Sequence, residues 1–109
     1  MNEKELYRVL SVLEHPVYPI TLPMSTSMPA ITYMLVHEGI DQCHGYDVVG
    51  KTRRYQVDVW AESYAEAKSI AQSVVESLIE YRCFDVSVMD SFEDDTGVYR
   101  QIIDIKTKE

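Results

Sequence analysis

The chain has 109 residues, so we expect one domain spanning 1–109, large enough to bury roughly two-thirds of its unfolded surface without disulfides or metals. Hydrophobic residues make up 46% and charged residues 26%, which are globular values that exclude wholesale disorder. The formal net charge of −8 disfavours nucleic acid and anionic membranes as partners, because neutralising phosphates requires clustered Lys and Arg.

The sequence predicts a chain made and kept in a reducing compartment. No apolar run approaches the length of a transmembrane span, and the first five residues lack the charged-then-apolar pattern of a signal peptide. The two cysteines, Cys43 and Cys83, are too few for a disulfide framework.

The N-terminal segment predicts a helix followed by a long extended loop. Apolar residues recur at helical spacing over 3–14, and Asn2 can cap the helix. All four prolines fall within 16–29, and each disfavours helix at the preceding residue, so this segment is expected to be an extended loop. The loop carries apolar side chains that are unusual for a solvated segment, Ile20, Leu22, Met24 and Met28.

Two strands are expected next. Apolar residues alternate with other side chains over 30–37 and again over 52–61. Between them, 38–50 is predicted to be a polar, glycine-containing connection, longer than a usual hairpin loop and therefore mobile or functional. Trp60 is out of phase with Val57 and Val59, so it should point to the other face of the sheet.

The second half of the chain predicts a helix and a hairpin. Ser63 and Glu66 form the Ser-x-x-Glu pattern of a capping box at the start of a helix over 63–81. Strands are expected over 84–92 and 98–106, joined by a turn in which Gly97 supplies a positive φ.

These elements predict an α+β domain with the order α-β-β-α-β-β. The expected architecture is a four-stranded, mainly antiparallel sheet with two helices packed on one face. Such a sheet has one open face and at least one exposed edge, which another subunit commonly covers.

Three groups of residues in the sequence are candidate sites of chemistry. The cluster of His37, Asp41, Cys43 and His44 has metal-like residue types, but its spacing matches no standard zinc pattern, so a polar loop is favoured. Neither cysteine sits in a motif that would activate a thiolate. The carboxylates of Asp90, Glu93, Asp94 and Asp95 lack a calcium-loop pattern, so a solvated hairpin tip is favoured over acid–base work or cation binding. The sequence thus predicts no catalytic residue, no metal site and no cofactor.

The sequence supports contacts with other proteins better than it supports a site of chemistry. Trp and Tyr are enriched at interfaces, and apolar residues on a proline-held loop often lack intramolecular cover. Packing on the second sheet face explains Trp60 equally well. The residues expected to contact partners are Met24, Met28, His37, Asp41, His44, Tyr46 and Trp60.

Three segments, taken in order, carry a family resemblance. They are residues 29–33 (Pro-Ala-Ile-Thr-Tyr), the strand-to-helix junction over 56–67, and residues 96–100 (Thr-Gly-Val-Tyr-Arg) with Asp104 following. In this order and spacing they resemble the tail-completion, or head–tail joining, proteins of long-tailed bacteriophages and prophages. The resemblance covers most of the chain, and its motifs are structural.

The resemblance implies a non-enzymatic virion protein, assembled in the bacterial cytoplasm. Such subunits form a ring, often six-fold, at the head-proximal end of the tail tube. The implied partners are other copies of the chain, the tail tube protein and the head connector protein, with no membrane. DNA would pass through the lumen without specific binding, and acidic residues near 90–95 with Glu38, Asp41 and Asp47 are expected to line it. The alternative function is a small-ligand-binding or regulatory α+β domain.

Overall fold

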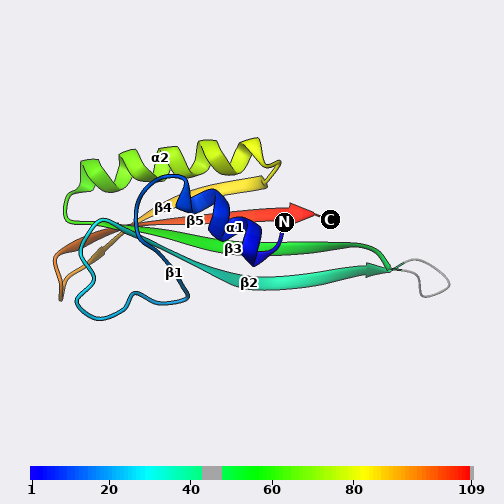
Figure 1. The fold of residues 1–109 in the computed structure, drawn as a ribbon, viewed down its shortest axis with the longest axis horizontal. Helices are drawn as coiled ribbons and strands as arrows, with labels where there is room; N and C mark the ends of the chain where they lie inside the picture. The colour runs from blue at the N-terminus through cyan, green and yellow to red at the C-terminus, as the bar shows by residue number, and fades with distance from the viewer. Residues whose placement is uncertain (43–47, 109) are drawn as a thin grey trace.

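The computed structural model describes residues 1–42 and 48–108. It contains two helices and five strands within this part of the chain (Figure 1). In chain order these are α1 (Glu3–Ser11), β1 (Val17–Pro19), β2 (Ala30–Gln42), β3 (Val48–Ala61), α2 (Tyr64–Glu80), β4 (Phe84–Glu93) and β5 (Val98–Lys108). No helix among the described residues is long and apolar enough to cross a membrane.

The strands form one mixed sheet in the order β1-β2-β3-β5-β4, so the predicted four-stranded, mainly antiparallel sheet is wrong. The added strand, β1, pairs in parallel with β2, with Val17 opposite Ile31. The Ile31 amide donates to the Pro16 carbonyl, and the Ile20 amide to the Tyr33 carbonyl, both at 2.8 Å. The prolines make this segment resemble a loop in the sequence. Proline is nevertheless tolerated on an edge strand, because one side of that strand forms no hydrogen bonds with a neighbouring strand.

The predicted connection over 38–50 is also largely wrong, because most of it is strand. β2 continues to Gln42 and β3 begins at Val48, and the two pair with each other throughout. β5 ends opposite Thr52, so the outer parts of β2 and β3 project as a two-stranded arm. We call residues 38–42 and 48–52 the arm. It lies at one end of a molecule measuring 53 × 25 × 22 Å (Figure 1).

A register shift at Val36 lets β2 change face at the root of the arm. Leu35 pairs with Tyr55, but His37 pairs with Arg54, so Val36 is an extra residue on its strand. Such a bulge swaps the faces to which the following side chains point. His37 therefore shares a face with Arg54, while Leu35 packs against the core.

Both helices begin at the caps that the sequence predicts. The Asn2 side chain accepts from the Glu5 amide at 2.9 Å, and the Ser63 hydroxyl accepts from the Glu66 amide at 3.2 Å. These bonds satisfy amides that have no partner within the first helical turn. α1 ends at Ser11 rather than at residue 14, because the chain tightens there and Glu14 takes a positive φ of 64°.

One face of the sheet carries the hydrophobic core, and both helices contribute to it. Leu6 and Leu10 of α1 and Leu78 of α2 are fully buried in one cluster with sheet residues. The sheet side chains in this cluster are Ile31, Tyr55, Val57, Val59, Ile103 and Ile105. The strand residues in the opposite phase form a second face, here called the open face.

Candidate functional site

A charged network occupies the centre of the open face. Arg100 donates through Nη2 to Oδ2 of Asp58 at 2.7 Å and through Nε at 3.2 Å. Gln56 donates to both Asp58 oxygens at 3.1 Å, and Glu93 accepts from Arg100 Nη1 at 3.3 Å. The Asp58 side chain is only 8% exposed, so these donors offset the cost of burying the carboxylate. The charged groups of the network bind one another. They therefore stabilise this face of the sheet and are not presented as reactive groups.

Trp60 points to the open face, as the strand phase predicts. Its indole N–H donates to the Thr32 hydroxyl at 3.0 Å, and the Arg100 guanidinium lies 4.7 Å from the ring centroid. A cation over an aromatic face is attracted by the ring quadrupole. Trp60 thus has partners within its own subunit, and its role in an interface stays a prediction.

The other residues predicted to contact partners do not form one patch. Met24 is 96% exposed, Met28 is half-buried, and His37 is exposed on the open face. The backbone of Asp41 lies in β2, whereas His44 and Tyr46, like Cys43, lie outside the described residues. Ala30, opposite Trp60, and His37 are seven residues apart on β2, about 20 Å at strand spacing.

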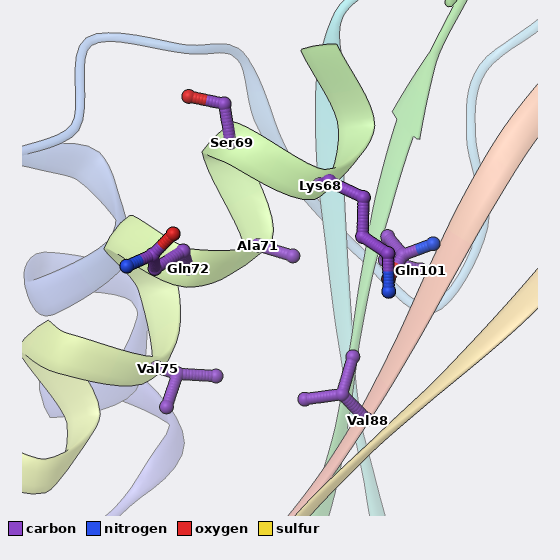
Figure 2. A pocket seen from close by; sticks show the side chains of 7 residues that line it. All are labelled: Lys68, Ser69, Ala71, Gln72, Val75, Val88 and Gln101. Atoms are coloured by element: carbon purple, nitrogen blue, oxygen red, sulfur yellow. The ribbon is translucent and has the colours of Figure 1, made fainter. Parts of the chain in front are cut away.

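A groove of about 370 Å³ runs between α2 and the edge strand β4 (Figure 2). Ala71, Val75 and Val88 give it apolar walls, and Figure 2 shows Lys68 reaching toward Gln101 at one end. Gln101 is fully buried, and its Oε1 atom has no hydrogen-bond partner among the described residues. The groove therefore offers an apolar surface, and the unpaired Gln101 oxygen is buried beneath it. The small-ligand function stays a prediction that a thermal-shift screen would test.

Asp90 connects β4 to α2 beside this groove. Its carboxylate accepts from Gln101 Nε2 at 2.7 Å and from the Tyr64 hydroxyl at 2.9 Å, and Lys68 Nζ lies 3.0 Å away. The hydrogen bonds from Gln101, Lys68 and Tyr64 lower the pKa of Asp90 below its ordinary value. Asp90 is therefore held as an anion by structural contacts.

The four carboxylates singled out in the sequence do not converge. Asp90 contacts α2, while Glu93 pairs with Arg100 on the open face. Asp94 and Asp95 are exposed in the turn between β4 and β5. No group of three or more His, Cys, Asp or Glu able to hold a metal occurs within residues 1–42 and 48–108. Of the other acids expected to line a lumen, Glu38 pairs with Arg53 of β3, and Asp47 lies outside the described residues.

Cys83 follows α2 and belongs to the hydrophobic core. Burial raises the pKa of its thiol above the ordinary value, because a low-dielectric surrounding disfavours the thiolate.

This burial predicts low thiol reactivity. In a Cys43→Ser variant, we expect Cys83 to react with a disulfide reagent about tenfold or more slowly at neutral pH than in the same chain unfolded in denaturant. The rate should rise with pH, because thiolate accumulates only as pH approaches the raised pKa. Equal rates in the folded and unfolded chains would contradict the burial of this thiol.

A second groove, of about 790 Å³, lies on the open face at the root of the arm. Its lining comes from four strands, with His37, Gly39, Thr52, Arg54, Phe84, Lys106 and Lys108. Of these seven residues, only His37 is among the partner contacts that the sequence predicts. No local pattern points to the rest, because pairing in the sheet brings them together. We call this the arm-root groove.

β4, one of the two outer strands of the sheet, exposes apolar side chains among its acids and serines. β4 pairs only with β5 among the described strands, and Met89 and Phe92 on it are 61% and 47% exposed. An unpaired edge with exposed apolar side chains is a template for contact with another chain.

Comparisons with known proteins show a shared fold. No family model matches the chain, and no curated protein matches it. Among solved structures, the chain is similar to one from the virion of a native gene transfer agent particle. The two share 15% identity with a TM-score of 0.68, over 94% of this chain and 90% of that chain. The assignment to the tail-completion family therefore rests on the resemblance in sequence.

Proposed function

We propose that this chain is a structural virion protein, a tail-completion subunit that joins the tail tube to the head. It assembles with copies of itself into a ring at the head-proximal end of the tail, between the tail tube protein and the head connector protein. DNA passes through the ring without sequence-specific contacts.

The observation that carries this proposal is the fold shared with a chain of a virion over nearly the full length of both proteins. The sequence resemblance to tail-completion proteins points to the same class independently of the structure. The surface adds physical support, because the outer strand β4 and the projecting arm lack cover within the described subunit.

The proposed role requires no catalysis. The charged groups described above are bound to one another, in the Asp58–Arg100 network and around Asp90, and Cys83 is buried. These arrangements stabilise a shape, which is the property that an assembly subunit needs.

Deletion of the gene from the phage or prophage that encodes it tests the function. We expect filled heads and free tails to accumulate separately in electron micrographs, with joined particles restored by a plasmid-borne wild-type gene. Mass spectrometry of the restored particles should detect the chain. Joined, infectious particles formed without the chain would refute the proposal.

A further inference from the structure

Half of the basic residues of this acidic protein gather toward one end of its long axis. Five of its ten Lys and Arg residues lie in the arm or in the strand ends beside it, namely Lys51, Arg53, Arg54, Lys106 and Lys108. The turn between β4 and β5 carries the consecutive acids Glu93, Asp94 and Asp95. Figure 1 shows this turn and the arm at opposite ends of the molecule.

The arm-root groove is lined by basic side chains and has one apolar wall. Its three cations face two nearby carboxylates: Arg54 binds Asp104 through two bonds of 2.9 Å, and Lys106 lies 3.2 Å from Asp85. Lys108 is exposed and has no ion pair among the described residues. Phe84, 40% exposed, supplies the apolar wall. The groove therefore retains a positive charge and can accept an acidic segment with an aromatic neighbour.

The β4–β5 turn is an acidic segment with an aromatic neighbour. Asp94 and Asp95 are exposed and have no ion pair among the described residues, and the neighbouring Phe92 is 47% exposed. The Gly97 amide donates to the Glu93 carbonyl at 2.9 Å, and Gly97 takes a φ of 68°, so the turn is closed by its own backbone. A turn that is already ordered loses little conformational entropy on docking.

We propose that the acidic β4–β5 turn of one copy docks in the arm-root groove of the next copy. This inference rests on the self-assembly in the proposed function and identifies its contact. The arm-root groove and the β4–β5 turn lie at opposite ends of one subunit. The contact is therefore heterologous and propagates head to tail, as a closed ring requires. It assigns Asp94 and Asp95 to the subunit contact rather than to the lumen.

Charge complementarity favours a second copy over DNA as the occupant. Copies with a net charge of −8 repel one another unless a positive patch meets a negative one. The groove supplies such a patch for the two unpaired carboxylates of the turn, whereas a phosphate backbone would continue past it along an acidic protein.

Paired charge reversals in the full chain test the contact. We expect Asp94→Lys/Asp95→Lys and Lys106→Glu/Lys108→Glu each to raise the dissociation constant for self-association about tenfold or more at low salt, measured by sedimentation velocity. An equimolar mixture of the two variants should recover association, because each turn then meets an oppositely charged groove. Thermal melting verifies that each variant is folded, and the single Lys108→Glu change replaces the groove variant if it is not.

The control is Glu76→Lys/Glu80→Lys on the exposed side of α2, which changes the net charge as much as the turn variant does. Both changes reduce the overall repulsion, so only a specific contact predicts weaker association of the turn variant. Three results would overturn the inference. The wild-type chain could stay monomeric at millimolar concentration, or the mixture of the two variants could fail to recover self-association. Duplex DNA could also bind the groove while the turn variant self-associates as tightly as the wild type. None of them bears on whether gene deletion prevents joining, so the proposed function is tested separately.

Discussion

Replacing Arg100 with methionine is expected to lower the free energy of unfolding by about 3 kcal/mol. The change removes both Arg100 bonds to Asp58, whose carboxylate is 8% exposed, and leaves Gln56 as its remaining side-chain donor. It also removes the cation over the Trp60 ring. Chemical denaturation followed by tryptophan fluorescence and by circular dichroism would measure the loss.

Arg54→Met is the matched control. Arg54 forms a two-bonded pair with Asp104, but its side chain is 48% exposed, so we expect a much smaller loss of stability than for Arg100→Met. Adding Asp58→Asn to Arg100→Met should recover part of the stability, because a neutral amide is less costly to bury than an unpaired carboxylate. Equal losses for the two arginine variants would show that Asp58 is not buried as described.

Leu78→Ala is expected to destabilise the protein by about 3 kcal/mol. Leu78 lies in the last turns of α2, is fully buried, and belongs to the cluster that joins both helices to the sheet. Truncation removes apolar contact and leaves a cavity that packed neighbours fill only partly. The shift of the denaturation midpoint at unchanged slope would measure the loss.

Ile79→Ala is the control for this prediction. Ile79 follows Leu78 in the same helix but is 55% exposed, so the loss should stay within about 0.5 kcal/mol. A loss for Ile79→Ala as large as that for Leu78→Ala would contradict the described orientation of α2. The pair therefore tests which side of the helix meets the sheet.

Local sequence patterns identified the interior of most elements. The alternation through Val57 and Val59 places Trp60 on the opposite face, and the structure confirms this placement. Ser63 and Gly97 mark a helix start and a turn, and both positions are confirmed. These signals are readable because each depends on residues a few positions apart, whose relation is set by backbone geometry alone.

The errors arose where pairing partners are distant in sequence. Val17–Pro19 becomes a strand only because Ile31–Tyr33 lies beside it, and the arm is strand because two polar segments satisfy each other's backbone groups. A proline-rich segment and a polar, glycine-containing segment both resemble loops when each is considered alone.

The sequence by itself determined the caps, the faces of the central strands and the family resemblance. Only the tertiary structure decided the strand order, the length of the arm and the two grooves. The arm-root groove joins His37 to Phe84 and Lys106, which are far apart in the chain and meet through cross-strand hydrogen bonds. Those bonds are made by backbone groups that all residues except proline share, so a local side-chain pattern does not reveal which strands meet.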